Sequence, residues 1–161
     1  MKLTLNIGCG DRTFKEYPKG YKCINVDERN LKSVDTVMDV RNLKFPDNHF
    51  DYILASDIIE HFPLSKIDNI LKEWTRVLKA AGIIEFRMPN LKTICKNYIS
   101  GSADAKLTSW LLYGAQDYPG NFHYVGFDRP LFKSVIKKHR LTEIEYREAG
   151  NNFEMKVRYR S

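Results

Sequence analysis

The amino-acid sequence predicts a single α/β domain, and three observations lead to that fold class. Short apolar runs typical of β-strands alternate along the 161 residues with runs of helical periodicity, the order of elements that builds layered α/β folds. A composition of 43% hydrophobic and 29% charged residues is typical of globular domains and excludes disordered, collagen-like and coiled-coil chains. The sequence has no internal repeat and no low-complexity linker, so we expect one domain over residues 1–161.

Five β-strands are expected in the first part of the chain. Their apolar runs include residues 3–7, 23–26, 37–38, 52–54 and 83–88. The first run leads into Gly8, the second ends at Asp27, and the third ends at Asp39 and Val40. Polar and glycine residues therefore follow the strands at the ends where ligands bind in parallel α/β sheets.

The strongest helical pattern lies between the fourth and fifth strands. Apolar residues recur there at three- and four-residue spacing, which gives one apolar face to cover the sheet. They are Ile67, Ile70, Leu71, Trp74, Val77 and Leu78. We expect Ser65 to cap this helix, with Asp68 completing a variant capping box, and Gly82 to end it. Asp128, with Pro130 in the first turn, predicts a second helix.

The end of the chain predicts a hairpin. Two β-type runs, at 141–147 and 153–159, are joined by Gly150-Asn151-Asn152. Because that joint is short, we expect the last two strands to pair antiparallel in a sheet that is otherwise mostly parallel.

The charge and the cysteine content limit which partners and which cellular location we expect. The net charge of +6 permits an anionic partner such as nucleic acid, a phosphorylated substrate or an acidic glycan. The basic residues are scattered, however, and the one tight cluster, at 137–140, is interpreted as a solvated helix face. No apolar run approaches the ~20 residues of a membrane span, so we expect no membrane span. The three cysteines form no C-x-x-C pair, so we expect a reducing, cytoplasmic location.

A nucleotide-type site is predicted after the first strand. Gly8 and Gly10 would let the backbone approach a ligand closely, and Asp27 could accept hydrogen bonds from ribose hydroxyls. A plain tight turn would use the same two glycines. Thr13 stands where the dinucleotide fingerprint needs a third glycine, which disfavours a nicotinamide enzyme.

Four segments taken in order make the prediction specific. They are LNIGCG at 5–10, DVRNLKFPDNHFD at 39–51, ASDIIEHF at 55–62 and LKEWTRVLKAAG at 71–82. This ordered set resembles the class I S-adenosylmethionine-dependent methyltransferases, closely over residues 3–89, and most resembles compact bacterial members encoded among surface-polysaccharide genes. The resemblance implies a Rossmann-like fold with seven strands in the order 3-2-1-4-5-7-6, helices on both faces, and S-adenosylmethionine as cofactor.

The resemblance also implies residue roles. Gly8, Cys9 and Gly10 would pass under the methionine part of the cofactor, while Asp27 would bind the ribose diol. The full implied cofactor-binding set is Asn6, Gly8, Cys9, Gly10, Asp27, Asp39, Val40 and Ser56. Asp39 and the Val40 backbone would meet the adenine, and Ser56 would line the sulfonium together with Asp57, which faces the acceptor.

The chain departs from the family pattern at several places. Arg12 stands near the usual third glycine, and Ala80-Ala81-Gly82 replaces the usual Pro-Gly-Gly. The short link between Gly10 and Asp27 leaves room for a very short first helix only. A cofactor-binding scaffold protein without catalytic activity is therefore an alternative to an enzyme.

Asp57, Glu60, His61 and His123 form a second candidate group. The D-x-x-E spacing puts both carboxylates on one face of a helical turn, and the histidines could complete an oxygen and nitrogen metal set. Some methyltransferases use a comparable E-x-x-E-H cluster for a divalent cation. We expect instead a metal-free site, in which Asp57, His61 and His123 are the candidate catalytic residues.

The sequence says less about the methyl acceptor than about the cofactor. We expect methyl transfer to an oxygen or nitrogen nucleophile of a small molecule or glycan, with residues 90–127 as a substrate-facing insert. Its aromatic residues and His123 would form a substrate wall or a small satellite core: Tyr98, Trp110, Tyr113, Tyr118, Phe122, Tyr124 and Phe127. A nucleic-acid methyltransferase is the alternative acceptor class, although the chain lacks an Asn/Asp-Pro-Pro-Tyr motif.

Overall fold

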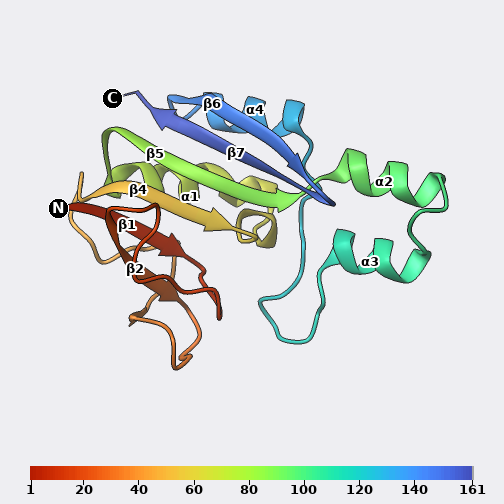
Figure 1. The fold of residues 1–161 in the computed structure, drawn as a ribbon, viewed down its shortest axis with the longest axis horizontal. Helices are drawn as coiled ribbons and strands as arrows, with labels where there is room; N and C mark the ends of the chain where they lie inside the picture. The colour runs from red at the N-terminus through yellow and green to blue at the C-terminus, as the bar shows by residue number, and fades with distance from the viewer. Residues whose placement is uncertain (161) are drawn as a thin grey trace.

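The computed structural model, which describes residues 1–160, is built on a seven-stranded sheet in the order β3-β2-β1-β4-β5-β7-β6 (Figure 1). The strands are β1 (Lys2–Ile7), β2 (Tyr21–Asp27), β3 (Thr36–Val37), β4 (Phe50–Ser56), β5 (Leu78–Pro89), β6 (Leu141–Ala149) and β7 (Asn152–Tyr159). β1 to β5 pair in parallel, and β7 pairs antiparallel with both β5 and β6. The predicted fold class, strand order and closing hairpin are confirmed.

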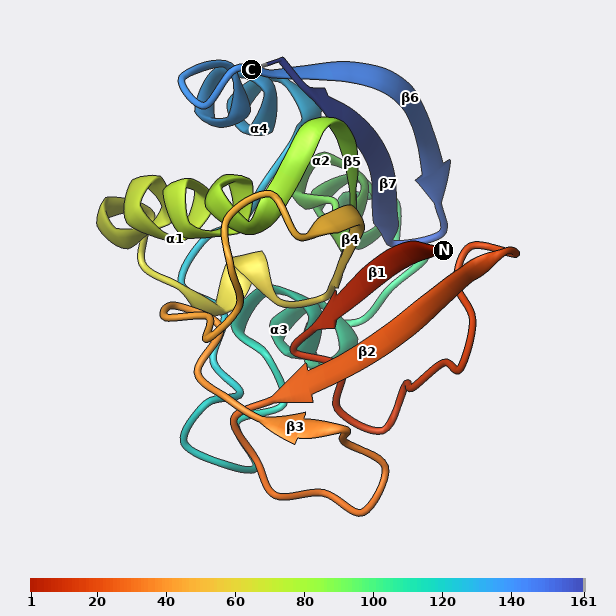
Figure 2. The same ribbon diagram turned by 90° about the vertical axis from the view of Figure 1, so that its left-hand side faces the viewer.

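The helices are α1 (Leu64–Val77), α2 (Leu91–Ile99), α3 (Ala105–Tyr113) and α4 (Arg129–Lys137), with a 3-10 turn, η1 (Ile59–His61), before α1. α1 and α4 cover the same face of the sheet (Figures 1 and 2). Their apolar stripes bury Trp74 and Phe132 against Phe86 of β5. This aromatic cluster is the centre of the core, as the helical periodicity predicts.

The opposite face of the sheet has no helix packed on it within residues 1–160 (Figure 2), so the expectation of helices on both faces is wrong. Residues 11–20, between β1 and β2, lie there without forming even a short helix. They are held by side chains of the sheet: Asn25 bonds the backbone N–H and C=O of Phe14, and the Tyr17 hydroxyl donates to Glu85 at 2.9 Å. Side-chain hydrogen bonds thus replace helix packing on this face.

The limits of α1 differ from the prediction. Pro63 precedes the helix and no side chain caps it, so the proposed capping box of Ser65 and Asp68 is wrong. Asp68 instead contacts His139 at 3.1 Å. The helix ends at Val77, because Leu78 pairs with Phe50 and begins β5, and Gly82 lies inside that strand. Leu78 keeps its predicted place in the core.

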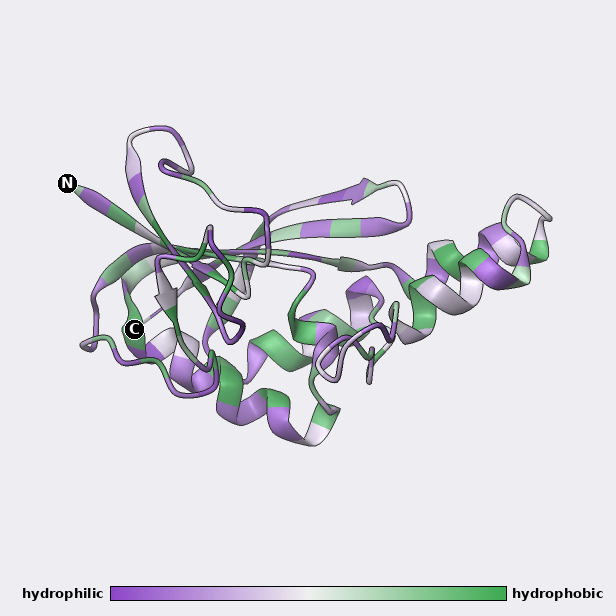
Figure 3. Ribbon diagram, turned by 90° about the horizontal axis from the view of Figure 1, so that it is seen from below, coloured by the Kyte–Doolittle hydropathy of each residue, from purple (hydrophilic) through white to green (hydrophobic). Residues whose placement is uncertain are grey.

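Residues 90–127 contain a helical hairpin that projects past the carboxyl ends of the strands (Figures 1 and 3). Asn90 caps α2 and Asp104 caps α3 through side-chain oxygens that accept backbone N–H bonds. The predicted Asp128 cap of α4, with Pro130 in the first turn, is confirmed. Figure 3 shows hydrophobic and hydrophilic residues mixed along the hairpin. Among residues 1–160, no helix has the length and apolar character to cross a bilayer.

Candidate active site

Two cavities adjoin at the carboxyl ends of the parallel strands. Their volumes are about 380 and 490 Å³. Both are lined by Gly8, Arg29, Asp57, His61 and Tyr118. They lie where the chain order reverses between β1 and β4, the place where open α/β sheets bind ligands.

The turn after β1 brings the backbone to the wall of both cavities. Gly8 has φ +60°, and a Cβ atom there would lie 2.6 Å from Cδ1 of Ile58, so both conformation and space require glycine. Cys9 is buried, and burial raises the pKa of its thiol to about 11. Cys9 is therefore a small packing residue and not an activated nucleophile.

Asp27 is a buried carboxylate in the wall of the 380 Å³ cavity. Burial alone would raise its pKa, but hydrogen bonds from Arg29 and from the Gly10 N–H outweigh burial and lower it. The Gly10 N–H donates to Oδ2 at 2.8 Å, and Nε of Arg29 donates to Oδ1 at 3.0 Å. The Arg29 guanidinium also lies 4.5 Å from the ring centroid of Tyr118. An ionised carboxylate is thus fixed beside the glycine turn.

Asp39 and Val40 line the same cavity as Asp27. β3 ends at Val37, so both residues follow the strand and do not belong to it. Asp39 forms a two-pronged ion pair with Arg41, at 2.9 Å between Oδ2 and Nη2. The Val40 carbonyl accepts a hydrogen bond from Nε1 of Trp74 at 3.0 Å, which joins this part of the cavity to the core.

Asn6 does not line either cavity, although the sequence placed it among the cofactor-binding residues. Its buried side chain donates to the Arg12 carbonyl at 2.8 Å and to Oδ1 of Asn25 at 3.0 Å. These bonds hold the turn that follows Gly10. Asn6 therefore positions the glycine turn, and it lines a third cavity, of about 180 Å³, together with Cys9 and Ser56.

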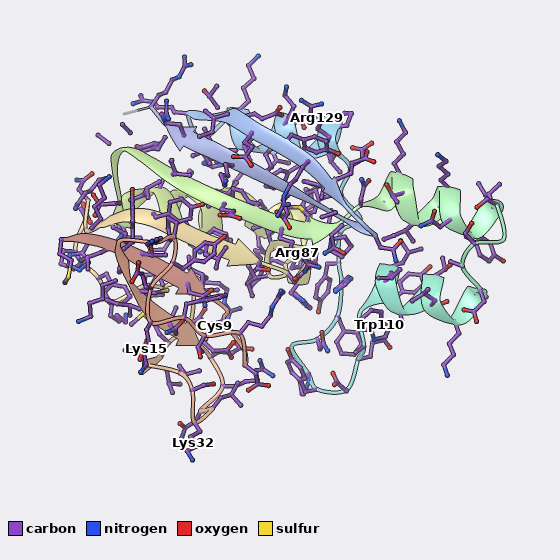
Figure 4. The ribbon with its side chains drawn as sticks, viewed as in Figure 1. Cys9, Lys15, Lys32, Arg87, Trp110 and Arg129 are labelled. Carbon is purple, nitrogen blue, oxygen red and sulfur yellow. The ribbon has the colours of Figure 1, made fainter. Side chains whose placement is uncertain are left out.

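Asp57 lies at the centre of a charged network. Its carboxylate accepts hydrogen bonds from Arg12, from Arg87 and, at 2.7 Å, from Nδ2 of Asn152. Ser56 adds a hydroxyl bond to the same carboxylate at 3.1 Å. The sequence did not indicate Arg87 or Asn152 as partners of Asp57. Figure 4 shows Arg87 near the end of β5 and Trp110 on α3, two residues that line the 490 Å³ cavity together with Cys9.

Glu60, His61 and His123 are brought together although the two histidines lie far apart in the sequence. The imidazole rings meet edge to face at 4.8 Å. Burial lowers the pKa of His61 to about 4, with a further contribution from His123, and burial also lowers the pKa of His123. Burial and the nearby Asp57 raise the pKa of Glu60 to about 8. Both histidines are therefore neutral at pH 7.

The insert contributes only some of its aromatic residues to the cavities. Trp110, Tyr118 and His123 line the 490 Å³ cavity, and Tyr124 lines the 380 Å³ cavity. Phe127 is core, while Tyr98 and Tyr113 line a separate cavity between α2 and α3 and Phe122 is partly exposed. Some of these aromatic residues therefore line the cavities at the strand ends, and Phe127 packs into the main core of the domain.

Residues 5–86 match a family model described as a methyltransferase domain. The chain belongs to the class I S-adenosylmethionine-dependent methyltransferases. The match covers the second half of β1, all of β2 to β4 and α1, and most of β5. This part of the methyltransferase carries the glycine turn, Asp27, Asp39 and Asp57.

Solved structures share the methyltransferase fold at low sequence identity. The PH0226 protein of Pyrococcus horikoshii OT3 is 19% identical with a TM-score of 0.73, covering 98% of this chain and 82% of that chain. The 1,6-didemethyltoxoflavin-N1-methyltransferase of Burkholderia thailandensis, with 1,6-didemethyltoxoflavin and S-adenosylhomocysteine bound, is 15% identical with a TM-score of 0.73, covering 99% and 71%. The N-methyltransferase NodS of Bradyrhizobium japonicum WM9, in complex with S-adenosylhomocysteine, is 14% identical with a TM-score of 0.62, covering 99% and 79%. A comparison with curated proteins finds no match.

Proposed function

We propose that this methyltransferase moves a methyl group from S-adenosylmethionine to an oxygen or nitrogen nucleophile of a small molecule or glycan. One observation carries the proposal: two adjoining cavities share the wall formed by Gly8, Asp57 and His61. Such a pair of cavities can hold a donor and an acceptor with their reacting groups at the shared wall. Positioning of this kind accounts for much of the rate of a displacement reaction.

The residues of the smaller of these two cavities, the one that contains Asp27, fit the cofactor. Asp27 is ionised and has acceptor capacity beyond its bonds to Gly10 and Arg29, as ribose hydroxyls require. Gly8 lines this cavity, and the Ile58 side chain fills the place that a Cβ atom would take there. We assign Asp39 and Val40 to the adenine end. The bound cofactor supplies an electrophilic methyl group on a sulfonium.

The acceptor side belongs to the 490 Å³ cavity. Trp110 and Tyr118 offer aromatic surface for a ring or a sugar face, and Asn121 offers an amide. Asp57 accepts hydrogen bonds from both Arg12 and Arg87, so its role is to orient these two arginines toward the cavity. His61 and His123 are neutral, and each presents a nitrogen lone pair for the acceptor side.

Two structural neighbours support these acceptor classes: the Burkholderia enzyme holds a small molecule, and the name of NodS, an N-methyltransferase, fits a nitrogen acceptor. The three free cysteines, of which Cys9 and Cys23 are buried, support a cytoplasmic location. Residues 1–161 are proposed to act as one domain, with 90–127 as the substrate-facing insert.

Calorimetry with S-adenosylmethionine and S-adenosylhomocysteine tests the proposal. We expect one molecule bound per chain, and transfer of a radiolabelled methyl group to an acceptor in a panel of small molecules and glycans. A protein that binds neither ligand at millimolar concentration would refute cofactor use. Tight cofactor binding without transfer to any acceptor would favour the scaffold alternative.

A further inference from the structure

Glu60, His61 and His123 converge on one point in the wall of the 490 Å³ cavity. One ligand atom from each residue lies within 4.8 Å of those of the other two. η1 supplies Glu60 and His61, and the loop after α3 supplies His123. Two imidazoles and one carboxylate form a donor set that divalent transition metals use with coordination positions left open.

The carboxylate of Glu60 is buried without a partner. The residue is 1% exposed, and within residues 1–160 neither Oε1 nor Oε2 has a hydrogen-bond partner. An unpaired buried carboxylate is costly, so it must take up a proton or face a cation. Arg87 is bound to Asp57 and is not hydrogen-bonded to Glu60. Within residues 1–160, no cationic side chain is therefore hydrogen-bonded to the Glu60 carboxylate.

The histidines are oriented as metal ligands are. Nδ1 of His61 lies 3.2 Å from the carbonyl oxygen of Phe122, and Nδ1 of His123 lies 3.0 Å from that of Leu111. A carbonyl oxygen only accepts, so each Nδ1 carries the hydrogen and each Nε2 carries the free lone pair. A backbone carbonyl bonded to the second ring nitrogen is the usual support of a metal-binding histidine.

Backbone hydrogen bonds hold the two segments in place. The Tyr124 N–H donates to the Glu60 carbonyl at 2.8 Å, and the His123 N–H donates to the Tyr113 carbonyl at 3.1 Å. The carbonyls of Leu111 and Tyr113 belong to the last turn of α3, where helix carbonyls lack helical partners. The loop is thus fastened both to η1 and to α3, so the three donors are preorganised.

We propose that Glu60, His61 and His123 bind a divalent transition-metal ion whose remaining coordination positions face the 490 Å³ cavity. Asp57 is not a ligand, because its carboxylate is engaged by Arg12, Arg87 and Asn152. The proposal reverses the sequence-based expectation of a metal-free site. The burial of Glu60 without a partner, and the carbonyls behind both imidazoles, could not be seen in the sequence.

The ion would make the acceptor cavity prefer one class of acceptor. This inference about the acceptor rests on the proposed function. An acceptor oxygen bound to a divalent ion has a lowered pKa. A metal-bound hydroxyl would then release its proton to solvent water in the open cavity, and its oxygen would be held near the wall shared by the two cavities. The acceptor class favoured by this site is a hydroxyl compound.

Cobalt binding to untagged, chelator-treated protein tests the site without any turnover. We expect one equivalent of Co²⁺, measured by calorimetry and by visible absorption, with one equivalent of metal found by elemental analysis. Loss of a supporting residue alone weakens metal sites about 10- to 100-fold. Glu60→Gln and His123→Asn, which remove ligands, should therefore each weaken Co²⁺ binding by at least about 100-fold. His49→Asn, which changes a histidine outside the cluster, should bind Co²⁺ as the unmodified protein does.

Circular dichroism shows which variants are folded, and Glu60→Gln and His123→Asn lie on separate segments, so one of them suffices. Unmodified protein that takes up no Co²⁺, or folded variants that bind it unchanged, would overturn the site. S-adenosylhomocysteine binding, measured separately on metal-free protein, tests the proposed function. Cofactor binding without Co²⁺ binding refutes the metal site alone, and Co²⁺ binding without cofactor binding refutes only the proposed function.

Discussion

Replacement of Trp74 tests how the core is joined to the 380 Å³ cavity, which we assign to the cofactor. The indole is fully buried against Phe86, and its N–H donates to the Val40 carbonyl at 3.0 Å. Trp74→Ala should lower the free energy of unfolding by about 3–5 kcal/mol. In a domain of this size, each kcal/mol shifts the Tm by about 2–4 °C. Trp74→Phe keeps most of the apolar volume but leaves the Val40 carbonyl without its indole partner, at a cost of about 1–3 kcal/mol.

Urea denaturation followed by circular dichroism measures both losses, and calorimetry with S-adenosylhomocysteine measures the effect on the cavity. The matched control is the other tryptophan, Trp110, which is 56% exposed. Trp110→Phe should change stability by less than about 0.5 kcal/mol. If Trp74→Phe cost no more than Trp110→Phe, the hydrogen bond to Val40 would contribute nothing and the reasoning would fail.

Three further predictions concern the glycine turn and its carboxylate. Asp27→Ala should weaken cofactor binding roughly 10- to 150-fold, since a charge-assisted bond contributes about 1.5–3 kcal/mol, and calorimetry showing unchanged affinity would contradict the ribose assignment. Gly8→Ala should abolish cofactor binding, because the added Cβ would lie 2.6 Å from Cδ1 of Ile58; an isothermal titration equal to that of unmodified protein would refute this. The lowered pKa of Asp27 stabilises the fold above its ordinary value of 3.8, and this stability is lost as the pH falls through the lowered pKa. Asp27→Asn should therefore show a shallower loss of stability below about pH 4 in acid titration.

The sequence predicted the fold through local patterns that survive in the structure. Strand-end residues such as Asp27 reach the expected edge because parallel strands expose their carboxyl ends together. The limits of α1 could not be predicted, because Leu78 continues the helical period while its backbone pairs with Phe50. Helix or strand at such a residue is decided by the neighbouring strand and not by its own side chain.

Most of the residues named from the sequence line the two cavities, but the contacts between them could not be predicted. Asn152 donates a hydrogen bond to Asp57, although the two residues lie far apart in the sequence. No local sequence pattern predicts this hydrogen bond. The spacing of Glu60 and His61 suggested a metal set, yet the choice between metal and packing depends on which atoms lack partners. Deciding between metal binding and packing requires the positions of neighbouring atoms in space, and sequence periodicity does not give them.

The helix-free face of the sheet makes residues 11–20 a region of low local stability. A helix would contribute its own ladder of hydrogen bonds, whereas this segment is held by side-chain bonds to Asn25 and Glu85 and by a few backbone bonds, such as that from the Cys23 N–H to the Lys15 carbonyl. Segments of this kind open by local unfolding at a lower free energy than the core. Because Arg12 belongs to the segment and contacts Asp57, each opening would also break this contact with the site. Amide hydrogen exchange in residues 11–20 should therefore be faster than in β1 and β4.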